Sequence, residues 1–290
     1  RGKIVLLDFW TFCCINCLHV LDELRPLEHK YRDVMVAIGI HSPKFAHEAE
    51  QESVVAAVQR YEVEHPVLND PSMHIWNQYA VRAWPTLAVI DPEGYVVAQL
   101  SGEGHAHALD VLIGELIDEH EAKGTLHRGD SPYIPPPATR SELAFPSKAV
   151  YLPDGRLVVS DSAHHSLKVF AGDDLTVVVG TGERGWIDGD AQVAQFSEPN
   201  GIALLPSHVT RQVGFDLVVA DTVNHLLRGV DSATWTTTTI AGTGQQWMQG
   251  QADQGEATQT ALSSPWDIAW FDDAVIIAMA GVHRLDRLDL

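Results

Sequence analysis

The second half of the chain repeats itself, and this repetition constrains the fold more than any other feature of the sequence. A segment around His165 matches one around His225, which gives a period of 60 residues (225 − 165 = 60), and a weaker third copy surrounds His283, at 283 − 225 = 58. Short apolar runs typical of strands recur with the copies at 157–159, 217–219 and 275–277, preceded by Pro146, Pro199 and Pro265. Short strands that recur at a fixed period predict a β-propeller or a solenoid.

The second copy contains a motif that identifies the type of repeat. Residues 224–226 read NHL, the tripeptide for which NHL repeats are named, and the Asp-x-x-x-His pattern of the two stronger copies resembles those repeats. The resemblance implies a partial all-β NHL-type propeller at 145–290, with about three blades. The period exceeds the roughly 40–50 residues of an ordinary blade, so we expect insertions in the glycine-rich loops. We interpret the recurring acid and imidazole as a repeated structural hydrogen bond rather than a catalytic group: Asp161 with His165, and Asp221 with His225.

A proline-rich segment separates the repeats from the rest of the chain. Residues 131–137 read SPYIPPP, and consecutive prolines force an extended backbone that neither a helix nor a central strand adopts. We therefore predict a linker at 123–144, between an N-terminal domain at 1–122 and the propeller at 145–290.

All three cysteines of the chain lie within five residues, as Cys13, Cys14 and Cys17. A secreted disulfide scaffold spreads an even number of cysteines along its chain, so this class is excluded. KIVLLDFW at 3–10 is typical of a buried strand, and the leucines after the cysteines recur as in an amphipathic helix. A CxxC motif at the start of a helix places its first thiol near unpaired N–H groups and the positive end of the dipole, which favour the reactive thiolate. The second thiol, one turn later, can close a disulfide onto the first.

Two separate segments resemble a known family. DFWTFCCINC at 8–17 resembles the active-site segment of the thioredoxin superfamily, nearest its TlpA/ResA-like branch, and VRAWPTL at 81–87 resembles the cis-proline loop of that family. The resemblance implies an α/β thioredoxin-like sandwich over 1–122. The rest of this region fits it, with strands expected at 34–40, 86–90 and 95–100, and helices at 48–61, 72–79 and 105–122.

The resemblance also implies a role for each residue of the site. Cys14 is the attacking nucleophile, Cys17 resolves the mixed disulfide, and Asp8 is the buried acid that helps to deprotonate Cys17. Trp84 and Pro85 form the wall that faces the substrate, with a cis bond before Pro85. The implied activity is that of a thiol–disulfide oxidoreductase that uses no metal and no cofactor.

Several alternatives stay open. Cys13 stands where the family usually has an aromatic residue, and it is a candidate accessory thiol that could pair with Cys17. Thr11 and Cys14 have the Thr-x-x-Cys spacing of peroxiredoxins, without the preceding proline, so a thiol peroxidase using Cys14 is one alternative. A non-enzymatic interaction scaffold with a vestigial thioredoxin fold is another. Zinc is disfavoured because there is no second cysteine pair. We interpret five histidines between the expected elements as solvated or capping groups: His41, His47, His65, His105 and His107.

Charge and hydropathy limit the partners. Acidic residues outnumber basic ones 39 to 19, for a formal net charge of −20, so we expect no nucleic-acid partner. No apolar run approaches the roughly 20 residues of a membrane span. Together the two halves resemble NHL-repeat-containing thioredoxin-like proteins. This implies as partners protein thiols or disulfides, or a reductant such as thioredoxin, and an unknown protein on the propeller face.

The sequence also bears on where the protein is located. The chain begins with Arg1 rather than Met, so we expect the natural N-terminus, and any targeting signal there, to lie upstream. We expect a cytoplasmic location because chains of this two-domain type are more often cytosolic, with export as the alternative because TlpA/ResA-like domains are commonly exported.

Overall fold

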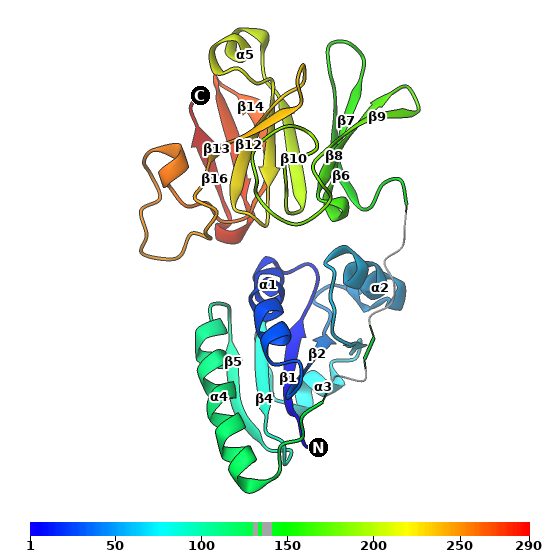
Figure 1. Ribbon diagram of the computed structural model, residues 1–290, viewed down its shortest axis with the longest axis vertical. Coiled ribbons are helices and arrows are strands. Elements are labelled where there is room, and N and C mark those ends of the chain that lie inside the picture. The colour runs from blue at the N-terminus through cyan, green and yellow to red at the C-terminus, as the bar shows by residue number, and fades with distance from the viewer. Residues whose placement is uncertain (130–132, 135–140) are drawn as a thin grey trace. The chain divides into compact units, whose positions relative to one another are not determined.

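The chain folds as two compact units, residues 1–139 and 140–290 (Figure 1). The computed structural model describes residues 1–129, 133–134 and 141–290. The three consecutive prolines of the predicted linker at 123–144 lie outside the described residues, as do its other members at 130–132 and 138–140. No helix in the described ranges is long and apolar enough to cross a membrane.

The first unit contains one five-stranded mixed sheet in the order β3-β2-β1-β4-β5, in which the central strand β1 runs parallel to β2 and antiparallel to β4. The strands are β1 (Ile4–Trp10), β2 (Met35–His41), β3 (Val67–Asn69), β4 (Thr86–Ile90) and β5 (Val96–Ser101). The helices are α1 (Ile15–Lys30), α2 (Gln51–Arg60), α3 (His74–Gln78) and α4 (Ala106–Lys123), with a 3₁₀ turn at Ala46–Ala49. This is the α/β thioredoxin-like sandwich that the sequence predicts.

Strand β1 is apolar on both faces because helices cover both sides of the sheet (Figure 1). Ile4 and Leu6 pack with residues of α1 and α4. On the opposite face, Leu7 and Phe9 pack with residues of α3. Because side chains alternate along a strand, Asp8 lies on the same face as Ile4 and Leu6, beneath α1.

Two features of the first unit differ from the prediction. The sequence does not predict β3, which has only three residues, too few for a recognisable alternation, and which forms by pairing with β2. The helix expected at 48–61 is instead a 3₁₀ turn at Ala46–Ala49 followed by α2. The extended backbone of Glu50 (φ −71°, ψ 129°) separates these two elements.

The second unit consists of three antiparallel sheets, which are the three blades that the copies of the repeat predict (Figure 1). Pro146, Pro199 and Pro265 are the first residues of the first strand of each sheet. The strands are β6 (Pro146–Tyr151), β7 (Leu157–Asp161), β8 (Ser166–Ala171) and β9 (Asp174–Val179); β10 (Pro199–Leu204), β11 (Leu217–Asp221), β12 (Leu226–Asp231) and β13 (Thr236–Ala241); and β14 (Pro265–Phe271), β15 (Ala274–Met279) and β16 (Arg284–Leu288).

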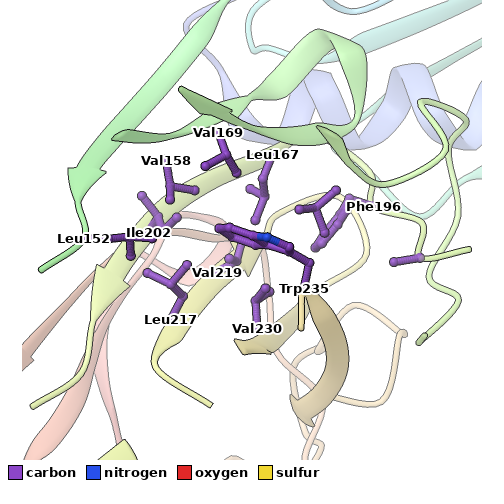
Figure 2. Close-up of a cluster of buried hydrophobic side chains, with 12 residues drawn as sticks. Leu152, Val158, Leu167, Val169, Phe196, Ile202, Leu217, Val219, Val230 and Trp235 are labelled. Atoms are coloured by element: carbon purple, nitrogen blue, oxygen red, sulfur yellow. The ribbon is translucent and has the colours of Figure 1, made fainter. Parts of the chain in front are cut away.

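The blades pack against one another through apolar side chains. Figure 2 shows the cluster shared by the first two sheets, in which Val158, Leu167 and Val169 lie together with residues of β10, β11 and β12 around the ring of Trp235. A second cluster joins the second and third sheets through residues of β11, β12, β14 and β15. Each sheet therefore buries apolar side chains against its neighbour, as expected of stacked repeats.

The recurring histidine ties each blade to the next one. His165 Nδ1 accepts a hydrogen bond from the backbone N–H of Glu198, one residue before β10 (3.2 Å). His225 Nδ1 accepts the equivalent bond from Ser264, one residue before β14 (2.9 Å). The structural role predicted for these two histidines is confirmed, but each accepts its bond from the next blade, and the bonds of Asp161 and Asp221 go to other side chains: His164 and Lys168, and Asn224 and Arg228.

Part of the extra length of the second blade is a helix. From the opening proline to the second strand there are 11 residues in the first blade (157 − 146) and 18 in the second (217 − 199). The helix α5 (Ser207–Val213) has seven residues, which equals the difference (18 − 11). The expectation that glycine-rich loops hold the insertions is therefore incomplete.

Candidate active site

Cys14 and Cys17 lie at the beginning of α1, a few residues after β1. Cys14 is the N-cap residue of the helix, and the Cys17 N–H donates to the Cys14 carbonyl (2.9 Å). Cys14 is 9% exposed and Cys17 is fully buried, whereas Cys13 is exposed, and all three are free thiols. The motif thus lies at the helix start that the sequence predicts, and Cys14 is the member of the pair that solvent reaches.

The two thiols of the pair have very different pKa values. A hydrogen bond from the Cys17 thiol is the chief cause that lowers the pKa of Cys14 to about 6, although burial opposes it. The backbone N–H groups of Cys17 and Asn16 and the charge of Lys44 also lower this pKa. Burial, and then the interaction with Cys14, raises the pKa of Cys17 well above its ordinary value. At neutral pH Cys14 is therefore mainly a thiolate and Cys17 a thiol, which suits an attacking and a resolving cysteine.

Asp8 is fully buried, and neither of its carboxylate oxygens has a hydrogen-bond partner among the residues that the structure describes. Burial raises the pKa of Asp8 to about 7. Among its neighbours, the charge of His65 lowers this pKa and the charges of Glu28 and Cys14 raise it. The charge of Asp8 in turn raises the pKa of Cys17. A carboxyl group that titrates near neutrality close to a buried thiol is suited to accept and return a proton.

The loop before β4 contains Trp84 and Pro85, and its Trp84 side chain packs against the cluster of the cysteine pair. The Trp84–Pro85 peptide bond is cis, as the resemblance implies. Trp84 packs against the side-chain cluster that contains Cys14 and Cys17, and its Nε1 donates to the Ser42 carbonyl (2.8 Å). The structure therefore places the indole beside the cysteine pair.

Sequence reasoning missed Glu48, which organises the loop before the cysteines. Its buried carboxylate accepts hydrogen bonds from the Thr11 hydroxyl and from the backbone N–H groups of Cys13 (3.0 Å), Lys44 (2.7 Å) and Phe45 (2.7 Å). Burial alone would raise the pKa of Glu48, but these donors outweigh burial and lower it. The available signal is an acid at the start of an expected helix, where carboxylates accept backbone N–H groups.

Cys13 differs chemically from Cys14. Its Sγ lies 3.5 Å from His47 Nε2. Burial of the sulfur, and then the charge of Glu48, raises the pKa of Cys13 to about 11. The Cys13 thiol is therefore protonated at neutral pH and is a weaker nucleophile than Cys14.

The interpretation of five histidines as solvated or capping groups is wrong for His41 and His65, which are buried. The His41 ring stacks on Phe12, with centroids 5.2 Å apart, and His65 Nδ1 lies 3.1 Å from the Glu28 carboxylate. Both rings are enclosed by segments distant in the sequence, which a local pattern does not reveal. The interpretation fits His47 and His107, which are exposed, whereas His105 is the N-cap residue of α4 without a capping bond from its side chain, and its Nε2 lies 3.0 Å from the Ser101 carbonyl.

Comparisons with known protein families give one match in each of the two units of the chain. The thioredoxin-like family model matches residues 2–96, and the NHL repeat model matches residues 143–170. The first match covers the cysteine pair and the cis-proline loop. The second covers the beginning of the first blade.

Relatives share the whole length of the chain. It is 38% identical to Protein SUPPRESSOR OF QUENCHING 1, chloroplastic, of Arabidopsis thaliana, over 98% of this chain and 27% of that protein. It is 36% identical to NHL repeat-containing protein 2 of Gallus gallus, over 100% of this chain and 40% of that protein. The thiol-disulfide oxidoreductase ResA of Bacillus cereus is 30% identical over 36% of this chain and 57% of ResA. The chain spans less than half the length of the first two relatives. It is an NHL-repeat-containing thioredoxin-like protein, with a thioredoxin-like domain similar to thiol-disulfide oxidoreductases followed by NHL repeats.

Proposed function

We propose that this protein is a thiol–disulfide oxidoreductase that uses Cys14 and Cys17 as its redox pair. The observation that carries the proposal is the unequal ionisation of two neighbouring thiols at the start of α1. The pKa of Cys14 is about 6, whereas that of Cys17 is raised well above its ordinary value. A pair of this kind supplies a thiolate for attack and holds a second thiol in reserve.

The proposed reaction has two steps. In the first step, the Cys14 thiolate attacks a disulfide of the substrate, the S–S bond breaks, and one substrate thiolate leaves. In the second step, Cys17 gives its proton to the Asp8 carboxylate, and the new Cys17 thiolate attacks Cys14 Sγ. The second substrate thiolate then leaves, and the enzyme holds a Cys14–Cys17 disulfide. Two electrons pass from the pair to the substrate, and the reverse sequence oxidises a substrate dithiol.

The propeller is proposed as a platform that binds a protein partner. In the described residues, its recurring histidines accept backbone hydrogen bonds from the next blade, so they are engaged in holding the blades together. The thiol chemistry is therefore assigned to the first unit and recognition to the second. Protein thiols or disulfides are the proposed substrates.

The alternatives gain little support from the geometry. A thiol peroxidase was suggested by the spacing of Thr11 and Cys14, but the Thr11 hydroxyl donates to Glu48. A vestigial scaffold would have no need of an ionised Cys14 beside a buried, unpaired Asp8. Peroxide consumption that requires Cys14 would favour the peroxidase, and a Cys14→Ser protein with full biological activity would favour the scaffold.

The proposal is tested by titrating the full chain against glutathione buffers and mapping the bridges by mass spectrometry. We expect a reversible Cys14–Cys17 disulfide that forms equally well in the Cys13→Ser variant. A Cys17→Ser variant should instead accumulate mixed disulfides at Cys14. If no bridge forms, or if Cys13 alone reacts, the assignment of the pair is wrong.

A further inference from the structure

We infer that His65, held by Glu28, passes protons between Asp8 and solvent while Cys17 resolves the mixed disulfide. The inference rests on the proposed oxidoreductase function, and it gives that function two positioning residues outside the family-like motifs. Asp8 must lose a proton in every cycle after it has taken one from Cys17. Because Asp8 is fully buried and its oxygens have no hydrogen-bond partner, this proton needs a route out of the core.

One end of the route lies beside Asp8. In the β1–β2 register Asp8 pairs with Gly39, and residues paired across neighbouring strands direct their Cβ positions to the same face of the sheet. A Cβ atom on Gly39 would lie 2.9 Å from Trp10 Nε1, 3.1 Å from Val67 Cγ2 and 3.2 Å from His65 Nε2. The imidazole therefore shares with these two side chains the space that a side chain at Gly39 would take, on the face where Asp8 lies. His65 is 5% exposed, and within the described part of the chain its Nε2 has no hydrogen-bond partner.

The other end of the route reaches solvent through Glu28. His65 Nδ1 lies 3.1 Å from both carboxylate oxygens of Glu28. If Nδ1–H donates to this carboxylate, Nε2 is left as the acceptor on the side of Asp8. The exposed fraction rises along the series, from 0% for Asp8 to 5% for the His65 side chain and 22% for that of Glu28.

Two cavities next to this pair provide room for water. His65 and Glu28 both line a cavity of about 20 Å³ between α1 and residues 63–65, and a larger one of about 210 Å³. The smaller volume is sufficient for roughly one water molecule, and its lining includes polar side chains that can hold it. A proton that reaches His65 or Glu28 therefore has a solvent acceptor close by.

The charges around the pair are coupled to Asp8. The charge of His65 lowers the pKa of Asp8, and the charges of Glu28 and Cys14 raise it. Other titratable or charged groups also line the two cavities: Arg25 and His29 of α1, Arg32 just after it, Glu64 and Tyr133. Cys17 faces Asp8 from the first turn of α1.

The proposed transfer moves protons only. Cys17 gives its proton to Asp8 as its thiolate attacks Cys14. Asp8 then passes the proton to His65 Nε2 across one bridging water molecule, because the described structure has no direct hydrogen bond between the two groups. His65 becomes an imidazolium paired with the Glu28 carboxylate, and this imidazolium releases a proton to water. The electrons follow the sulfur atoms as described above.

The test separates the two steps of exchange in the full chain. Reduced protein carrying Cys13→Ser is mixed with 5,5′-dithiobis(2-nitrobenzoate), which releases one thionitrobenzoate when Cys14 attacks and a second when Cys17 resolves the adduct. His65→Gln should leave the first release within about twofold and slow the second roughly tenfold at pH 7, less than the loss of a direct general base. Its pH–rate midpoint for the second release should rise because the imidazolium form of His65, whose charge lowers the pKa of Asp8, is lost. Glu28→Gln should also slow the second release, but its midpoint should fall because a negative neighbour is lost.

Controls decide between a proton route and a merely structural pair. Glu64→Gln removes an exposed acid next to His65 and should leave both releases unchanged. If Asp8→Asn slows the second release while folded His65→Gln and Glu28→Gln proteins keep the wild-type midpoint and rate, the inference is overturned and the proposed function stands. If the parent protein releases only one thionitrobenzoate, the proposed function itself fails. Should His65→Gln not fold, the more exposed Glu28→Gln decides by the direction of its midpoint shift.

Discussion

Asp8 of the first unit and Asp221 of the second are both fully buried in inner strands of their sheets, but their surroundings differ. The Asp221 carboxylate accepts hydrogen bonds from Arg228, Asn224 and the Ser197 N–H, each at 2.8 Å. Asp8 has no hydrogen-bond partner. Burial raises the pKa of Asp221, but the charge of Arg228 and the bonds from Asn224 and the Ser197 N–H oppose this rise and favour the carboxylate. A paired buried acid therefore holds structure, whereas an unpaired one changes its protonation state more readily.

A buried acid paired with a basic side chain occurs in both of the first two blades of the propeller. In the first blade, Asp161 lies 2.8 Å from Lys168 Nζ and 2.6 Å from His164 Nδ1, at positions that correspond to Arg228 and Asn224 in the second. The first unit has no such copy of the surroundings of Asp8 among its described residues. A buried acid that recurs with its cation therefore indicates scaffolding, and an isolated, unpaired one indicates chemistry.

Breaking the paired acid should have the largest effect. Asp221→Asn keeps the shape of the side chain but removes the buried counter-charge of Arg228, which is also fully buried and keeps only the half-exposed Asp188 carboxylate (2.6 Å). We expect the second unit to lose about 3–5 kcal/mol of unfolding free energy. Urea unfolding measures this loss when each unit is followed separately by hydrogen–deuterium exchange of its peptides. Asp173→Ala, in an exposed turn, is the control and should change stability by less than about 0.5 kcal/mol. A loss below about 1 kcal/mol for Asp221→Asn would show that the Asp221–Arg228 pair contributes little to the stability of the second unit.

Replacing the unpaired Asp8 should instead raise the free energy of unfolding. The pKa of Asp8 is about 7 in the folded state and 3.8 ordinarily, so between these values the folded state binds more protons than the unfolded one. Stability contributed by protonated Asp8 is therefore lost as pH rises from about 4 to 7. Asp8→Asn, which stays neutral, should be more stable than the parent by about 2–4 kcal/mol at pH 8 and equal to it near pH 4. The same unfolding assay measures this difference in peptides of β1 and β2, with exposed Asp118→Asn as control. If Asp8→Asn were less stable than the parent at pH 8, the contrast between an unpaired Asp8 and a structural Asp221 would be wrong.

Glu48 tests whether a buried acid is structural because it has hydrogen-bond donors or because it lies in the propeller. It lies in the first unit, yet its carboxylate is satisfied by four donors, as in the propeller. We expect Glu48→Gln to cost about 1–3 kcal/mol at neutral pH because charge-assisted hydrogen bonds are lost. The pKa of Glu48 is lowered, so the stability it contributes is present above its ordinary pKa and disappears as pH falls through the folded value. The difference between the variants should therefore shrink in acid. Glu50→Gln, an exposed neighbour, should change little, and an equal effect of both would count against the role of Glu48.

Local patterns predicted the parts of the molecule that are encoded locally. Cys14, Cys17 and Asp8 lie in one ten-residue motif, and the prolines at the start of each blade mark strands directly. Glu48 and His65 escaped prediction because their partners Cys13 and Glu28 lie 35 and 37 residues away in the sequence. Their environment arises only when the 3₁₀ turn at Ala46–Ala49 packs against the loop before α1 and the segment before β3 packs against α1. A single histidine or glutamate carries no periodic signal of such a contact.

The smallest expected effect concerns a cation at the edge of the site. The rate at which iodoacetamide alkylates Cys14, in the Cys13→Ser background, should have its midpoint near pH 6. Lys44 is exposed and lowers the pKa of Cys14 by its charge, so Lys44→Gln should raise the midpoint by about 0.2–0.5 pH units, the range of an exposed charge pair. Lys30→Gln, at the far end of α1, should leave it unchanged. The difference should fade at high ionic strength, because salt screens an exposed charge, whereas the pairing of Arg228 with Asp221, both fully buried, should resist it. A midpoint near 9 in the parent protein would remove the basis for Cys14 as the nucleophile.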